Sequence, residues 1–333
     1  MKTLVIGLNW LGDIIMSFPA LALDHERTPT TLSVVTRPHL AAAYLLHPHP
    51  LDVIPLDTSQ SLWAQIPTIR RLRREQYDQI IVFPRSFRTA FIARLCGGTT
   101  RIGFAAEGRS WLLHQALPLP EDLVTRHEST LYQILVREAG LTCLSECPSA
   151  RLPSAPQQEE LFTRLGLKRQ RYLVLAPGAA FGPAKRWPPQ HFREIAQRWV
   201  REYQTPVVLT GSVGEAELTS VVRNNTSDLI IDLAGKTSIA ELTVLLSQAT
   251  AMIANDSGTM HLGALTRTPM VIPIGPTTPE RTGPLSDCAT LVRARRDHEP
   301  CRQRTCPRQG LSCLEQLPPD EVWAALQARV RQP

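Results

Sequence analysis

Short apolar runs alternate with segments of helical periodicity along most of this chain. In the first half, strands are predicted at residues 3–8, 31–36 and 79–83, and helices at 12–23, 61–75 and 87–96. Strands that alternate with helices pair in parallel, because each crossover helix returns the chain to the same edge of the sheet. The pattern therefore predicts a doubly wound α/β sheet.

The alternation stops between residues 145 and 158, where Ser, Pro, Ala and Gln follow one another without periodicity, as in a linker. It then restarts, with strands predicted at 172–176, 206–210, 229–232, 251–254 and 270–274, and helices at 188–203, 214–224, 238–249, 258–267 and 320–331. We therefore predict two α/β domains, at residues 1–155 and 156–333, with the last helix packing back on the first domain.

The composition fits a folded protein of two domains, with 333 residues, 43% hydrophobic and 20% charged. No apolar stretch reaches the roughly 18 residues of a membrane-spanning helix. Asn9 and Asp13 interrupt the first apolar run, so we expect a strand there rather than a signal peptide, and a cytoplasmic protein. The net charge of +6 would suit an anionic small molecule, a membrane surface or nucleic acid. Since no nucleic-acid-binding module is recognised, nucleic acid is not an expected partner.

Seven cysteines are an odd number, which argues against a complete disulfide framework. Cys301, Cys306 and Cys313 follow Cys288 in a segment rich in Pro, Arg and Gln, but their spacing does not match a Cys-x-x-Cys metal knuckle. A loop of reduced thiols is the favoured interpretation, and a structural metal is the alternative.

The loops that follow strands are the candidate ligand-binding segments, because doubly wound sheets bind ligands at the carboxyl ends of their strands. The first loop, GLNWLGD, ends in Asp13, which is either a helix-start acid or a general base. No Lys-Ser or Lys-Thr pair follows its glycines, so it is not a P-loop. The loop PGAAFGPAKRWPPQHF is stiffened by prolines, and Gly178 and Gly182 allow close approach of a ligand. It is therefore predicted to present Lys185 to a phosphate.

Two further loops carry candidate donor-binding residues. In TGSVGEAE, Glu215 either caps a helix or accepts the hydroxyls of a ribose. In IANDSGTMHLGAL, the exposed amides at a helix start form an anion site that can hold a diphosphate. Ser257 can cap that helix, and His261 lies one turn further along it.

Six stretches in order resemble the ADP-heptose:lipopolysaccharide heptosyltransferases, and among them heptosyltransferase II most. They are Gly-x-x-x-x-Gly-Asp at 7–13, PGAAFGPAKRWP at 177–188, GS-x-x-E at 211–215, LAGKTS at 233–238, NDSGTMH at 255–261 and GPTTP at 275–279. SFRTA at 86–90 also fits. The resemblance implies the B-type glycosyltransferase fold of two facing Rossmann-like domains with a cleft between them. It further implies inverting transfer of L-glycero-D-manno-heptose from ADP-heptose to the lipid A-linked inner core of lipopolysaccharide, without a metal or other cofactor.

The same resemblance implies roles for individual residues. Asp13 would be the general base, and Lys185 would neutralise the departing diphosphate. The donor would be bound by Glu215 at the ribose, by the segment around Thr237 at the adenine, and by the amides around Ser257 and Gly258, helped by His261, at the phosphates. Asp256 is a further candidate donor-binding residue. Arg85 and Arg88 would bind anionic groups of the acceptor, although this sequence has Arg-Ser at 85–86 where the family is expected to have Asn-Ser.

Three questions stay open on the sequence. The acceptor could be that of heptosyltransferase I or of another ADP-sugar transferase. A non-catalytic nucleotide-binding protein is a further alternative, which the presence of both Asp13 and Lys185 disfavours. The basic run Arg70–Arg74 at a helix end is either a solvated face or a peripheral contact with the inner membrane.

Overall fold

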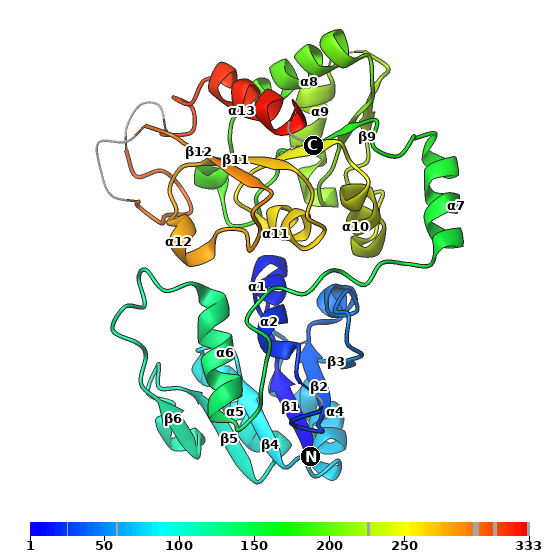
Figure 1. Ribbon diagram of the computed structural model, residues 1–333. Coiled ribbons are helices and arrows are strands. Elements are labelled where there is room, and N and C mark those ends of the chain that lie inside the picture. The colour runs from blue at the N-terminus through cyan, green and yellow to red at the C-terminus, as the bar shows by residue number, and fades with distance from the viewer. Residues whose placement is uncertain (25, 58, 225–226, 296–299, 309–311, 332–333) are drawn as a thin grey trace. The chain divides into compact units, whose positions relative to one another are not determined.

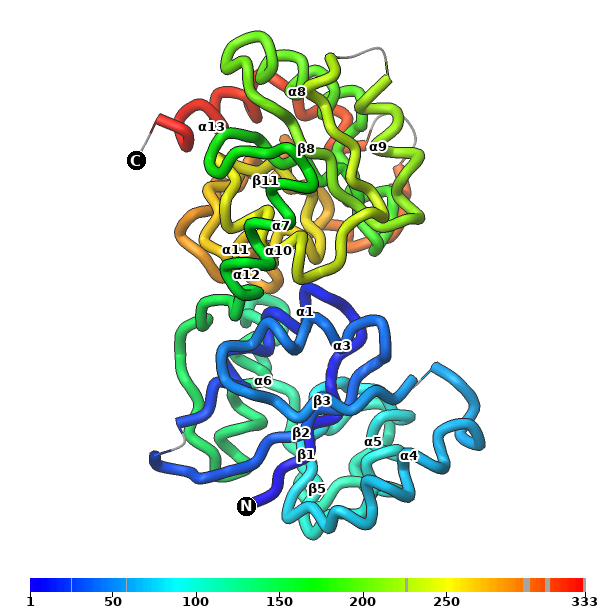
Figure 2. Tube along the Cα trace, turned by 90° about the vertical axis from the view of Figure 1, so that its right-hand side faces the viewer, coloured from blue at the N-terminus to red at the C-terminus, as the bar shows by residue number. Residues whose placement is uncertain are grey.

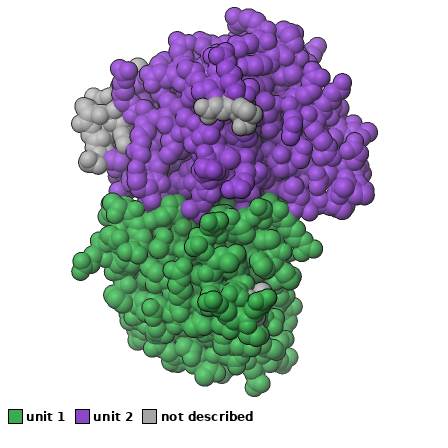
Figure 3. Space-filling model, in the orientation of Figure 1, with its two compact units in different colours: residues 1–151 green, residues 152–333 purple. Residues whose placement is uncertain are grey.

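The computed structural model describes residues 1–24, 26–57, 59–224, 227–295, 300–308 and 312–331. These residues belong to two compact units, 1–151 and 152–333, which Figure 3 colours separately. The division lies at 151/152 rather than at the predicted 155/156. Within the described ranges, no helix combines the length and the apolar character needed to cross a membrane.

The first unit is built on a parallel sheet whose strand order is β3-β2-β1-β4-β5-β6 (Figure 1). The strands are β1 (Lys2–Ile6), β2 (Thr31–Thr36), β3 (Asp52–Pro55), β4 (Gln79–Val82), β5 (Thr100–Phe104) and β6 (Gln115–Leu117). This is the Rossmann order, in which the direction of winding reverses between the first and fourth strands. Because Ile6 is in register with Val82, the loops that follow β1 and β4 start side by side.

Helices pack in two groups on this sheet. They are α1 (Leu11–Met16), α2 (Phe18–Leu21), α3 (Ala41–Tyr44), α4 (Leu62–Arg74), α5 (Phe87–Cys96) and α6 (Glu128–Glu138). α4 and α5 lie beside each other (Figure 2), and α1 contacts α2, α3 and α6. Buried Leu72 and Ala93 of the α4–α5 group pack with Ile6 and Val82 of the sheet. The first unit therefore has the sandwiched parallel sheet that the sequence predicts.

The second unit repeats this topology with the order β12-β11-β10-β7-β8-β9. Its strands are β7 (Leu173–Ala176), β8 (Val207–Leu209), β9 (Ile230–Asp232), β10 (Ala251–Ala254), β11 (Met270–Ile274) and β12 (Ala289–Arg293). Counted from β7, the order is again 3-2-1-4-5-6, and the winding reverses between β7 and β10. Ala176 is in register with Ala254, so the loops after these two strands also start as neighbours.

Seven helices complete the described part of this unit: α7 (Ala155–Leu165), α8 (Pro189–Tyr203), α9 (Ala216–Arg223), α10 (Ile239–Ser247), α11 (Gly258–Leu265), α12 (Pro279–Thr282) and α13 (Pro319–Arg331). Trp187, Trp199 and Trp323 join the core between the sheet and helices α8, α9 and α13. The last helix packs against α8, β10, β11 and β12 of its own unit. Its contact with the first domain stays a prediction.

Two predicted elements differ from the structure. The helix expected at 12–23 is divided at Ser17 into α1 and α2, because the ring of Pro19 would clash with a carbonyl of the preceding turn if the helix ran on. The linker expected at 145–158 ends earlier, because α7 already begins at Ala155. Ser154 caps this helix, and its backbone N–H and hydroxyl both donate to Oε1 of Gln157, at 3.0 and 2.8 Å.

Candidate active site

Asn255 connects the loop after β10 with the loop after β7, the two neighbouring strands at which the winding of the second sheet reverses. Its side chain is fully buried, and its Nδ2 donates to the carbonyl of Pro177 at 2.7 Å. Its Oδ1 accepts from the backbone N–H of Trp187 at 2.9 Å. One side chain after β10 therefore holds both ends of the proline-rich loop after β7.

Lys185 lies within this fixed loop and forms an ion pair with Asp256, the residue after Asn255. Its Nζ is 2.9 Å from Oδ2 of Asp256, and the two side chains are only 13% and 8% exposed. The hydroxyl of Thr277, from the loop after β11, donates to the same Oδ2 at 2.5 Å. The Phe181 ring lies below the ammonium, 5.0 Å from Nζ to the ring centroid. A buried charge must be paired to be tolerated, so Asp256 and Thr277 hold Lys185 in one place.

The start of α11 lies directly after Asp256 and offers an anion site. Ser257 is the N-cap residue, and its buried Oγ has no hydrogen-bond partner among the described residues. Gly258 is the first residue of the helix, and His261 is buried one turn further on. Unpaired N–H groups and the helix dipole favour a negative group at such a position. An unsatisfied buried hydroxyl adds one donor to that set.

Glu215 and Thr237 lie in loops at the same sheet edge. Oε2 of Glu215 accepts from the backbone N–H and the hydroxyl of Ser212, at 2.8 and 2.9 Å, so this carboxylate caps its own turn. A side chain on Gly178 would overlap the Glu215 carboxylate, which explains the glycine there. The turn that contains Thr237 is held to the loop after β8 by a hydrogen bond from Gly235 N–H to the Gly211 carbonyl, at 2.9 Å. The predicted donor-binding residues thus share one edge, while their contacts with a donor stay predictions.

The cysteine segment packs on this edge. The carbonyl of Arg304 accepts from Ala184 N–H at 3.0 Å, and a side chain on Gly182 would collide with it. Arg302 N–H donates to the Pro276 carbonyl at 2.9 Å. The segment therefore braces the Lys185 loop. Its cysteines form no disulfide, and the described residues contain no group of three or more metal-ligating side chains.

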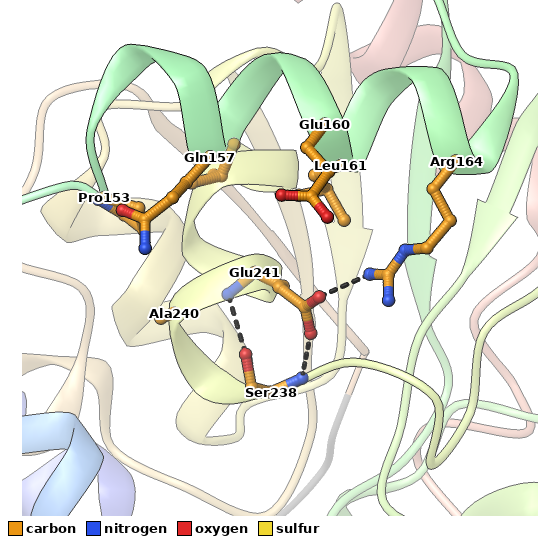
Figure 4. Close-up of a pocket in the computed structure, with 9 residues that line it drawn as sticks. Pro153, Gln157, Glu160, Leu161, Arg164, Ser238, Ala240 and Glu241 are labelled. Carbon is orange, nitrogen blue, oxygen red and sulfur yellow. Dashed lines mark hydrogen bonds and ion pairs between the residues drawn. The ribbon is translucent and has the colours of Figure 1, made fainter.

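A separate pocket lies between α7 and α10 (Figure 4). Glu241 caps α10 through Ser238 and is also paired with Arg164 of α7. Gln157 and Glu160 line the same hollow from α7. These polar groups already satisfy one another in part, so we assign the pocket to the packing of α7 on the unit.

In the first unit, Asp13 lies in the first turn of α1 and is half-buried. The turn before it requires Gly7, since a side chain there would meet the Val35 carbonyl and the Tyr44 hydroxyl. Burial is the largest cause that raises the pKa of Tyr132, and the negative charge of Asp13 is the second. Burial and the charge of Asp13 also raise the pKa of Tyr44. Both phenols therefore stay protonated beside the Asp13 carboxylate.

Arg85 and Arg88, which follow β4, point to different partners. Nη2 of Arg85 donates to both carboxylate oxygens of Glu128, at 2.8 and 3.0 Å, and the Glu128 side chain is 6% exposed. Burial raises the pKa of Tyr132, the charges of Asp13 and Glu128 raise it further, and the Arg85 charge lowers it. Arg88 is exposed and donates from Nη2 to the carbonyl of Gln60. Arg85 is therefore held by an ion pair with a buried carboxylate, whereas Arg88 lies at the surface.

Arg109 also belongs to this region, although its sequence context does not mark it as a site residue. It is fully buried, and its Nη1 donates to the carbonyls of Pro84 and Ser86, at 2.5 and 3.0 Å. Its Nε donates to the carbonyl of Phe104 at 3.0 Å, and burial lowers the pKa of the guanidinium to about 10. This side chain fixes the backbone that presents Arg85.

Glu107 holds the same loop from its other end. Its Oε2 accepts from the N–H of Phe87 at 2.9 Å, at the start of α5. The segment AAEGR looks like an ordinary solvated turn, so the sequence gives no signal for either of these contacts.

Comparison with known proteins shows the family to which the chain belongs. The model of glycosyltransferase family 9 (heptosyltransferase) matches residues 67–312. Lipopolysaccharide heptosyltransferase 2 of Salmonella typhimurium is 32% identical over 309 residues, which cover 88% of each chain. Lipooligosaccharide heptosyltransferase 2 of Haemophilus influenzae is 31% identical over 311 residues, again 88% of each.

A solved structure shows the same architecture. The structure of E. coli ADP-heptose LPS heptosyltransferase II is 26% identical and matches with a TM-score of 0.84, covering 100% of this chain and 99% of its own. The two Rossmann-like sheets described above thus form the B-type glycosyltransferase fold. Since the family model covers most of the chain and relatives match at over 30% identity, the chain belongs to glycosyltransferase family 9, the heptosyltransferases, and is a glycosyltransferase.

Proposed function

We propose that this enzyme is a heptosyltransferase II, which transfers L-glycero-D-manno-heptose from ADP-heptose to the heptose of a lipid A-linked inner core. The names of its relatives support this donor and pathway. The observation that carries the chemistry is the Lys185–Asp256 pair next to the start of α11, because it keeps a cation beside an anion-binding helix end.

The second unit is the proposed donor-binding domain. The diphosphate of ADP-heptose binds the amides of Ser257 and Gly258, with the Ser257 hydroxyl and His261 as further partners. Glu215 binds the ribose, and the turn around Thr237 lines the adenine. As the bond between the anomeric carbon and the diphosphate breaks, negative charge grows on the leaving oxygen, and the Lys185 ammonium stabilises it.

The first unit is the proposed acceptor-binding domain. Asp13 accepts the proton of the acceptor hydroxyl while its oxygen attacks the anomeric carbon from the face opposite the diphosphate, so the configuration inverts. Arg85, oriented by Glu128, and the exposed Arg88 bind anionic groups of the acceptor. Because that acceptor is anchored in lipid, we also propose that the enzyme works at the cytoplasmic face of the inner membrane.

Release of ADP from ADP-heptose tests this assignment. Two acceptors are compared: an inner core that ends in one heptose, and one that ends in Kdo. Heptosyltransferase II should release ADP only with the first. Release only with the second would make the enzyme a heptosyltransferase I, and binding of ADP-heptose without release on either would favour a non-catalytic protein.

A further inference from the structure

Aromatic side chains form an exposed surface at the start of α5. Trp111 and Phe87 are 64% and 40% exposed, with their ring centroids 6.1 Å apart. The half-buried ring of Phe91 stacks on Phe87 at 6.5 Å. Single exposed apolar residues are ordinary on protein surfaces, but three rings in contact form a patch that usually has a partner.

The surroundings of this patch are strongly basic. The guanidinium of Arg94 lies 6.0 Å from the centroid of the Trp111 ring. α4 packs beside α5 and carries the exposed run Arg70, Arg71, Arg73 and Arg74. Residues 62–96 contain seven arginines and two acidic residues, while the whole chain has 36 basic and 30 acidic ones. The excess of positive charge is therefore concentrated on these two helices.

Trp63 extends the aromatic character to α4. It is 82% exposed in the first turn of that helix. The nearby carbonyl of Gln60 accepts from Arg88, so the start of α4 and the start of α5 are joined. One exposed tryptophan thus lies on α4, and the other, Trp111, follows β5 and contacts Phe87 and Arg94 of α5.

We propose that this surface, formed by Phe87, Trp111, Trp63 and the exposed arginines of α4 and α5, docks the enzyme on an anionic lipid bilayer. Tryptophan partitions into the headgroup region of a bilayer, because its ring is apolar and its N–H is polar. Arginines near the surface are attracted to anionic headgroups. The inference rests on the proposed function, in which the acceptor is lipid-linked. Phe87 lies between Arg85 and Arg88 in the sequence. Docking through Phe87 therefore holds the loop that carries these two proposed acceptor-binding arginines close to the lipid headgroups.

Vesicle flotation of the full-length enzyme tests the proposal. Vesicles of phosphatidylethanolamine and phosphatidylglycerol should bind the enzyme, with an affinity that falls as salt is raised, and phosphatidylcholine vesicles should bind it weakly. Arg94→Gln should lower the partition coefficient on the anionic vesicles about fivefold, and Trp111→Ser should lower it by at least as much. Leu45→Ser is the matched control, because Leu45 is a 60% exposed apolar residue of the first unit outside this surface.

The proposal is overturned if the wild-type enzyme does not float with anionic vesicles, or if both variants float like the control. Two other outcomes, in an enzyme that does not float, would assign the surface to another partner. A dimer that Trp111→Ser dissociates would assign it to a second copy of the chain, and RNA binding that Arg94→Gln abolishes would assign it to RNA. ADP release with a water-soluble, deacylated acceptor separates docking from catalysis. Trp111→Ser and Arg94→Gln should retain it, and its loss in both would make the surface part of the acceptor site.

Discussion

The Nζ of Lys185 and the Oδ2 of Asp256 lie 2.9 Å apart although the two residues are far separated in the sequence. The strand order brings them together, because β7 and β10 are neighbours where the winding of the sheet reverses. The hydroxyl of Thr277 donates to the same oxygen of Asp256, so three loops meet on one carboxylate. Asp256 therefore keeps the Lys185 ammonium paired with an opposite charge close to the start of α11.

Removing the counter-ion should destabilise the enzyme. Asp256→Asn keeps the shape but leaves the largely buried Lys185 ammonium without an opposite charge, so the free energy of unfolding should fall by about 3 kcal/mol. Thr277→Val is the matched control, because it removes only one hydrogen bond and should lose about 1 kcal/mol. Urea unfolding measures both. Equal losses in the two variants would mean that the ion pair contributes nothing beyond the hydrogen bond.

Lys185→Met tests whether the ammonium acts in the transition state. The loss should appear mainly in kcat, by roughly 2.7–4 kcal/mol, because negative charge on the diphosphate grows only as the glycosidic bond breaks. Lys185→Arg should restore part of the rate, since its planar group differs from a point charge. Steady-state kinetics with ADP-heptose measure this. A raised KM with an unchanged kcat would instead mean that Lys185 binds donor and transition state equally.

Arg109 should act on the acceptor through the loop that it holds. In Arg109→Met the carbonyls of Pro84, Ser86 and Phe104 lose their donor, so the unfolding free energy should fall by about 2 kcal/mol or more. The KM for the acceptor should rise while the KM for ADP-heptose stays unchanged.

Arg101→Met is the control for this variant. Arg101 is also a buried arginine of the same unit, but it donates to the Leu112 carbonyl and not to the loop after β4. It should lower stability and leave the acceptor KM unchanged. If both variants raise that KM alike, Arg109 has no specific positioning role.

His47 should make the stability of the enzyme sensitive to acid. Its ring is buried against the carbonyls of His49 and Phe18, and burial lowers its pKa below the ordinary value of 6.5. Below that value the unfolded chain binds a proton that the folded chain does not, so the free energy of unfolding falls as the pH is lowered. From about pH 7 to about pH 5, His47→Gln should show a shallower fall than the wild type in urea unfolding. Identical slopes would show that His47 does not contribute.

Much of the fold can be predicted from the sequence, because the apolar runs are short and bounded by turn residues. β2, β10, β11 and α5 have the predicted bounds to the residue. β5 and β6 were not predicted, since Arg101 and Gln115 interrupt their apolar patterns. β6 lies at the edge of the sheet, where a strand needs less apolar surface, so its pattern is weaker, whereas β5 is an inner strand whose pattern is broken by the buried Arg101.

The candidate site could be predicted in part, because local sequence patterns also mark the loops that follow strands. Lys185 was identified because a stiff loop after a strand can be recognised locally. Its pairing with Asp256 was not, because it depends on which strands are neighbours. Arg109 and Glu128 were missed because a buried charged residue looks in the sequence like an exposed one, and only packing distinguishes them.

Mass spectrometry of the acceptor tests the central claim most directly. An inner core that ends in one heptose is incubated with ADP-heptose and enzyme, and the mass gained by the acceptor is followed with time. We predict the addition of one heptose by the wild type, and a rate lower by about a hundredfold or more for Asp13→Asn, whose amide cannot take the proton of the acceptor hydroxyl. ADP release without a gain in acceptor mass, or an undiminished rate in Asp13→Asn, would contradict the account.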